Sequence, residues 1–94
     1  MQLAGNSERE WDEIRAVVDA LPRSRILAAT EHYLHATLKS RLFGFIDDLE
    51  LKLDPQTKMI GIRSASRSGS YDMGVNRRRV ENLRKQLKAA ALIL

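Results

Sequence analysis

Three consecutive arginines, Arg77, Arg78 and Arg79, stand where the sequence predicts the start of a helix. The position is electrostatically unfavourable, because the free amides of a helix N-terminus carry partial positive charge and attract anions. Successive helical residues point about 100° apart, so the three guanidinium groups cannot all serve one ion pair. The cluster therefore predicts that negatively charged oxygen atoms gather at this end of the helix.

Two sources of negative oxygen fit the sequence. In the structural interpretation, which we prefer, aspartates pair with the arginines and hold loop, sheet and helix together. This polar cluster comprises Asp47, Asp48, Arg63, Ser64, Ser66 and Asp72. In the alternative, the free amides of the helix and its arginines bind a small anion such as phosphate, carboxylate or a lipid head group, because guanidinium groups bind such oxygens bidentately. The anion-binding residues would be Arg67, Asn76, Arg77, Arg78 and Arg79.

No pair of residues predicts catalysis. A nucleophilic serine needs a nearby base, and the only histidines are His32 and His35. Three positions apart on an extended chain, these histidines face opposite sides, which also makes them a poor metal pair. Asp47 and Asp48 are adjacent and face opposite sides as well, so they suit arginine partners better than acid–base chemistry. With no cysteine in the chain, the sequence predicts no catalytic residue, metal site or cofactor.

The elements that position these residues follow from hydrophobic periodicity. A capping box of Ser7 and Glu10 predicts a first helix, which Pro22 ends. Four strand-like segments follow at residues 25–30, 33–41, 48–53 and 59–67. A second helix is predicted after a cap at Asn76, with an apolar stripe that continues to Leu94.

The hairpin around residues 55–58 fixes the register of the last two strands, because the apolar faces must coincide. On the inner face the predicted pairs are Leu53 with Ile60, Leu51 with Ile62, and Leu49 with Ser64. On the outer face, this register places Glu50 beside Arg63. It also places Asp48 diagonal to both Arg63 and Arg67, so the two arginines have a purely structural explanation as a charge ladder.

The order of elements predicts an α+β fold. A four-stranded antiparallel meander with two helices on one face, a two-layer sandwich, buries every apolar stripe. Ninety-four residues suffice for a single domain, residues 1–94. Ser64 and Ser66 are expected to face the helices, and a free sheet edge could support a homodimer.

Charge is distributed unevenly along the chain. Residues 1–60 carry 8 basic and 10 acidic side chains, whereas residues 61–94 carry 8 basic and 2 acidic ones. The basic end suits an anionic partner, although such runs are usually solvated faces. Nucleic acid is not expected, because the five aromatic residues form no basic–aromatic strand motif. No transmembrane or signal segment is predicted, so the cytoplasm is the default compartment.

Two stretches, "YLHATLKSRLFGFIDDLELKLDP" and "IRSASRSGSYDMGVNRRRVENLR", resemble the family catalogued as domain of unknown function 1499. The resemblance runs from about Trp11 to Arg84 and is densest between Ser64 and Arg79. The matching residues are Ser40, Arg41, Phe45, Asp47, Asp48, Arg63, Ser64, Ser66, Arg67, Gly69, Asp72, Gly74 and Asn76 to Arg79. The family has no established activity, so the resemblance contributes positions and no mechanism. It also implies that an N-terminal family segment, with a cysteine and paired serines, is missing here and could supply a fifth strand.

The function predicted from the sequence is that of a non-enzymatic interaction or accessory module, in which the arginine–aspartate cluster is structural. Binding of a small anion at the second helix is the alternative, and a hydrolytic enzyme ranks last.

Overall fold

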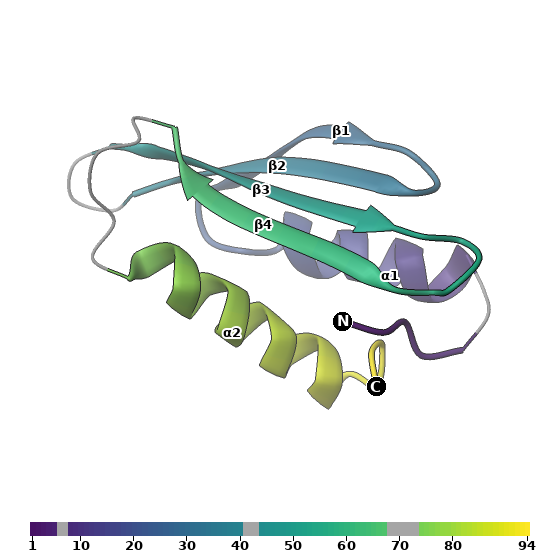
Figure 1. The fold of residues 1–94 in the computed structure, drawn as a ribbon. Coiled ribbons are helices and arrows are strands. Elements are labelled where there is room, and N and C mark those ends of the chain that lie inside the picture. The colour runs from purple at the N-terminus through teal and green to yellow at the C-terminus, as the bar shows by residue number, and fades with distance from the viewer. Residues whose placement is uncertain (6–7, 41–43, 68–73) are drawn as a thin grey trace.

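The computed structural model describes residues 1–5, 8–40, 44–67 and 74–94 of the chain. Its elements follow the predicted order of one helix, four strands and a second helix, and the α+β prediction is confirmed. They are α1 (Glu8–Asp19), β1 (Ser24–Ala29), β2 (Tyr33–Lys39), β3 (Ile46–Leu53), β4 (Ile60–Ser66) and α2 (Val75–Ala89). Figure 1 shows both helices on one face of the sheet, where α1 packs against β1 and β2 and α2 packs against β4.

The sheet is an antiparallel meander in the order β1-β2-β3-β4. The predicted register between β3 and β4 is confirmed, with Leu53 opposite Ile60, Leu51 opposite Ile62 and Leu49 opposite Ser64. Apolar residues alternate with polar ones along β3, so a slip of one residue would expose its whole apolar set. The pairing between β1 and β2 is interrupted by a bulge between Ile26 and Ala28.

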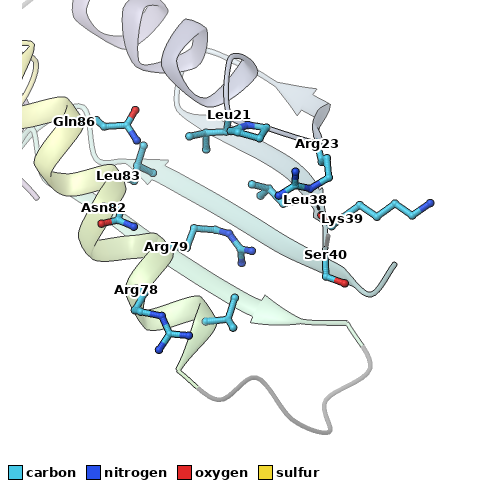
Figure 2. Close-up of a pocket in the computed structure, with 12 residues that line it drawn as sticks. Leu21, Arg23, Leu38, Lys39, Ser40, Arg78, Arg79, Asn82, Leu83 and Gln86 are labelled. Atoms are coloured by element: carbon cyan, nitrogen blue, oxygen red, sulfur yellow. Dashed lines mark hydrogen bonds between the residues drawn. The ribbon is translucent and has the colours of Figure 1, made fainter. Parts of the chain in front are cut away.

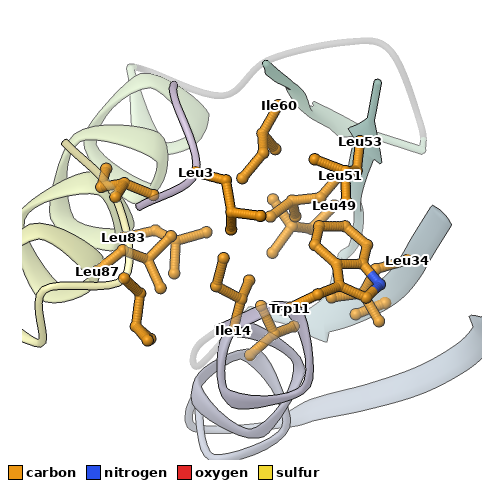
Figure 3. Packing of buried hydrophobic residues seen from close by; sticks show 14 of the residues in the cluster. Leu3, Trp11, Ile14, Leu34, Leu49, Leu51, Leu53, Ile60, Leu83 and Leu87 are labelled. Carbon is orange, nitrogen blue, oxygen red and sulfur yellow. The ribbon is translucent and has the colours of Figure 1, made fainter. Parts of the chain in front are cut away.

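The core lies between the sheet and the two helices (Figure 3). Helical spacing brings Trp11, Ile14 and Val18 of α1 onto one buried face, and Leu83 and Leu87 of α2 onto another. These side chains pack on the inward residues of the strands, which are Leu34, Ala36, Leu38, Leu49, Leu51, Leu53 and Ile60. Full burial of each large side chain contributes about 1.5–3 kcal/mol, so this layer provides the main stabilisation.

Both ends of α2 differ from the prediction. The helix begins at Val75 after Gly74, whose φ of 77° is left-handed, and no side chain caps it, so the prediction of an Asn76 cap is wrong. The helix ends at Ala89, and the left-handed φ of 59° at Ala91 turns the chain back. Continuation of the apolar stripe to Leu94 is therefore also wrong, since that residue is 73% exposed.

The first residues of the chain lie along the start of β4, between that strand and the end of α2 (Figure 1). Met1 and Ile60 exchange both backbone hydrogen bonds, at 3.0 and 2.6 Å, and the Leu3 amide donates to the Lys58 carbonyl at 2.9 Å. Leu3 is buried and also forms a bridge with Ile93. Ser7 of the predicted capping box lies outside the described residues.

Candidate functional site

The guanidinium group of Arg79 is the centre of a polar cluster between the sheet and α2. Its Nη1 donates to Asp47 Oδ2 at 2.9 Å, to Asn76 Oδ1 at 2.6 Å and to Ser64 Oγ at 3.2 Å. The Ser64 hydroxyl in turn donates to Asn76 Oδ1 at 2.6 Å. These four residues, which we call the inner cluster, therefore connect two strands to the first turn of α2.

Three features of the fold bring the inner cluster together. Asn76 and Arg79 are three residues apart and share one side of α2. Asp47 of β3 is directly opposite Ser66 of β4, two residues from Ser64, and all three side chains point toward the helices. The Asp47 side chain is only 8% exposed and that of Arg79 16% exposed. Because buried charges are costly unless they are paired, Asp47 and Arg79 depend on each other.

A second cluster lies on the helix-free face of the sheet, around Asp48. Arg67 binds this carboxylate through two nitrogens, Nη2 to Oδ1 at 2.8 Å and Nε to Oδ2 at 3.2 Å. His35 Nε2 lies 2.8 Å from the same Oδ1. The hydrogen bond from Arg67 has the largest effect and lowers the pKa of Asp48. Burial opposes it, the hydrogen bond from His35 adds to it, and the resulting pKa is about 2.

Glu50 occupies the next outward position of β3 and has a similar environment. The Tyr33 hydroxyl donates to Glu50 Oε2 at 2.6 Å, and Arg63 Nη1 donates to Oε1 at 2.8 Å. The bond from Tyr33 has the largest effect on the pKa of Glu50, and together with the bond from Arg63 it lowers that pKa. The bond between Tyr33 and Glu50 also raises the pKa of Tyr33. We call these two carboxylates and their partners, Arg67, His35, Arg63 and Tyr33, the outer cluster.

The residues predicted to bind an anion are distributed over both faces. Arg67 lies on the helix-free face against Asp48, and Asn76 is buried inside the inner cluster. Arg77 is exposed and forms no ion pair with a described residue, since the nearby Glu81 instead accepts from Arg84 at 2.8 Å. Arg78 and Arg79 of the set line a common cavity. Ser66 is half-buried opposite Asp47. Asp72, Gly69 and Arg41 lie outside the described residues.

That cavity is a groove between the end of α1 and the first half of α2 (Figure 2), with a volume of about 570 Å³. Leu21, Leu38 and Leu83 supply apolar surface to it, and the other lining residues are Pro22, Arg23, Lys39, Ser40, Val75, Arg78, Arg79, Asn82 and Gln86. Figure 2 shows Arg78 and Arg79 reaching from α2 and Arg23 on the opposite wall, whereas Lys39 extends away along the rim. The groove therefore combines an apolar lining with cations from three segments of the chain.

The described lining of the groove is made of apolar, cationic and uncharged polar side chains. Ser40 and Lys39 are lining residues of types that can act as nucleophiles, but none of the described lining residues is an aspartate, glutamate or histidine that could serve as a general base. Among the described residues, no group of three or more side chains could hold a metal ion. No helix in the described ranges is long and apolar enough to cross a membrane.

Sequence reasoning missed two sets of residues. Arg23 and Lys39 join the groove because β1 and β2 pair, and the Arg23 side chain donates to the Lys39 carbonyl at 3.0 Å. The position of Arg23 directly after Pro22 was the signal available in the sequence, and the structure places it in a turn with φ of 59°. His35 and Tyr33 join the outer cluster through the pairing of β2 with β3, where His35 is opposite Glu50. A register for that pair, derived in the same way as for β3 and β4, would have found them.

A family model described as "Protein of unknown function (DUF1499)" matches residues 1–87. No curated protein matches the chain, and no solved structure matches it.

Proposed function

The chain belongs to the DUF1499 family, and we propose that it is a non-enzymatic binding module for a small amphiphilic anion. The groove between the helices is the binding site. A carboxylate or phosphate of the ligand pairs with Arg23 and Arg78, and an apolar group lies against the leucines. The observation that supports this proposal is the convergence of cationic side chains from separate elements on an apolar groove.

Charge in the groove favours an anion. Arg23 precedes β1 and Arg78 lies in the first turn of α2, so both are fixed to rigid elements on opposite walls. Arg79 lines the same groove and pairs with Asp47 at 2.9 Å. Arginine stays protonated at all physiological pH values and binds planar oxyanions through two parallel hydrogen bonds. The attraction of the groove for an oxyanion therefore does not depend on the titration of its arginines.

The apolar lining of the groove favours an anion that also carries an apolar group over an inorganic ion. Leu21, Leu38 and Leu83 contribute side chains to a space of about 570 Å³, which is within the usual range for small-molecule sites. Burial of apolar ligand surface against them would contribute roughly 25 cal/mol per Å². A ligand with an acidic head and a short alkyl or aryl tail thus uses both properties of the groove.

The inner cluster has a positioning role in this proposal. Asn76 and Ser64 hold Arg79 and, with it, the first turn of α2 against the sheet. Gly74 supports the same turn, because its φ of 77° suits glycine and the Arg78 guanidinium lies close above it. The prediction of a structural arginine–aspartate cluster and the prediction of an anion site are then compatible, since one supports the other.

Titration with decanoate and decyl phosphate, followed by amide chemical shifts and calorimetry, tests the proposal. Decyltrimethylammonium supplies the same tail with the opposite charge, and inorganic phosphate supplies a head group alone. We expect both anionic amphiphiles to shift resonances of Leu38 and Leu83, and both controls to bind at least about tenfold more weakly, because each lacks one of the two contacts.

Arg78→Gln should weaken decanoate binding about tenfold, the loss expected for one charge-assisted hydrogen-bond pair. The matched control is Lys85→Gln, an exposed cation on the same helix that does not line the groove. Equal loss in both variants would mean that only general charge attracts the ligand. That result, or equal binding of the cationic amphiphile, would contradict the proposal.

A further inference from the structure

The outer edge of β4, the last strand of the sheet, is distinct from the groove. Hydrogen bonds across an antiparallel pair alternate between residues that bond the neighbouring strand and residues that point outward. Two backbone bonds show which residues of β4 face β3. The Asp54 amide donates to the Met59 carbonyl, and the Arg67 amide donates to the Ile46 carbonyl. Every second residue of β4, beginning with Ile60, therefore directs its amide and carbonyl groups away from β3.

The chain itself shows how this edge is used. Ile60, the first outward residue, exchanges both backbone bonds with Met1, and Lys58 accepts from Leu3. Residues 1–3 are thus added to the sheet as a short antiparallel strand. The next outward residues are Ile62 and Ser64, and no described backbone group forms a hydrogen bond to their outward amides. The site continues in register beyond the segment that already occupies its start.

Side chains along the edge define the chemistry of a partner. Arg63 projects from the helix-free face with 69% of its side chain exposed, and Arg67 follows with 51% exposed. Each already binds a carboxylate of β3, but a guanidinium group has five N–H donors and can bond a further acceptor. On the other face, Ile62 is a half-buried residue at the margin of the core. A strand paired with β4 would place alternate side chains beside the arginines and beside Ile62. Acidic residues suit the positions beside the arginines, and apolar residues suit the positions beside Ile62.

We propose that the β4 edge binds an extended peptide in which acidic and apolar residues alternate, by antiparallel strand addition. The central contacts are the paired backbone bonds to Ile62 and Ser64, and the acidic side chains are aligned with Arg63 and Arg67. Main-chain bonds provide the affinity of such additions and the alternating side chains provide the specificity. An unpaired edge is otherwise open to uncontrolled association, so a defined partner would also protect it.

The peptide acetyl-VEVEV-amide, titrated into isotopically labelled protein, tests this inference without changing the fold. The amide resonances of Ile62 and Ser64 should shift on binding, and both amides should exchange more slowly with solvent. With the central valine opposite Ser64, its amide faces β4, whereas the glutamate amides point away. N-methylation of that valine should abolish binding, and N-methylation of the second glutamate should leave the Kd within about threefold, because only the first removes a bond to the protein.

Three results would overturn the proposal. Equal sensitivity to the two N-methylations would exclude strand addition in this register. Equal binding of acetyl-VKVKV-amide would exclude the role of the arginines. Sedimentation equilibrium showing a dimer that the peptide does not dissociate, with concentration-dependent shifts at Ile62 and Ser64, would assign the edge to a second copy of the chain instead.

Discussion

Asp47 and Asp48 are neighbours on β3, and each pairs with an arginine, yet the two pairs have different physical settings. Asp47 points toward the helices, where its side chain and that of Arg79 are 8% and 16% exposed. Asp48 points to the helix-free face, where its partner Arg67 is 51% exposed. One step along a strand thus separates a buried ion pair from one that water screens.

The difference determines what each pair contributes. In the inner cluster, the loss of one partner would leave a buried charge without compensation, which is far more costly than the net gain from forming the pair. In the outer cluster, water can replace either partner, so the loss is small. The inner cluster therefore fixes the position of α2, whereas the outer cluster mainly adjusts the response of the sheet to pH.

The largest effect is expected for Arg79→Leu. This change removes the cation but leaves the carboxylate of Asp47 buried, so the free energy of unfolding should fall by about 3–5 kcal/mol. Urea denaturation followed by circular dichroism measures it. The matched outer variant, Arg67→Gln, should lose no more than about 1 kcal/mol. Equal losses would show that burial does not distinguish the two pairs.

The double variant Asp47→Leu/Arg79→Leu refines the same comparison. Because it removes both charges together, it should recover at least half of the loss caused by Arg79→Leu alone. If the double variant lost as much unfolding free energy as Asp47→Leu and Arg79→Leu together, the two residues would act independently. The 2.9 Å contact between them argues against that result.

A smaller effect is expected for Asn76→Ala. The change removes the amide oxygen that accepts from Ser64 and Arg79, and should cost about 1–3 kcal/mol because both donors lie in a half-buried site. Thermal and urea unfolding measure the loss. If Asn76 acted as a helix cap instead, Asn76→Ser would restore stability, whereas the observed bonding predicts that serine is too short to do so.

The smallest effect concerns pH. The pKa of Asp48 in the folded protein, about 2, is below its ordinary value of 3.8, so its contribution is fully present above pH 3.8 and is lost as pH falls toward 2. Asp48→Asn should therefore lower stability at pH 7 by about 1 kcal/mol, after allowance for screening by solvent, and flatten the loss between pH 4 and 2. Denaturation at several pH values checks this, and an unchanged slope would contradict it.

Local patterns in the sequence were sufficient to predict the order of the strands and the register of β3 with β4. The alternation of leucines in β3 and the short hairpin after Leu53 fixed the register with β4, and Glu50 beside Arg63 followed from it. The ends of α2 could not be predicted in this way. The apolar pattern continues past Ala89, but Leu92 and Ile93 are buried through contacts with the first residues of the chain. Such distant contacts leave no local periodicity.

The candidate site was predictable only in part, for a related reason. Asn76 has the propensity of a cap, but tertiary contacts with Ser64 and Arg79 determine its conformation. The arginine triplet predicted negatively charged oxygen near the start of α2, where the structure places Arg79 beside Asp47. Which arginine faces which layer depends on the angle between helix and sheet, and Arg23 enters the groove from a segment more than 50 positions away. Neither property is encoded in spacing along the chain.

The two termini are joined in the fold, and this has a consequence for dynamics. Ala4 donates to Leu92 and Leu94 donates to Gln2, both at 2.9 Å, beside the buried Leu3. Chain ends usually fray first and exchange their amide protons fastest. Here hydrogen–deuterium exchange at Leu3, Ala4 and Leu92 should be as slow as in the middle of the sheet, and shortening either end should accelerate exchange at the other.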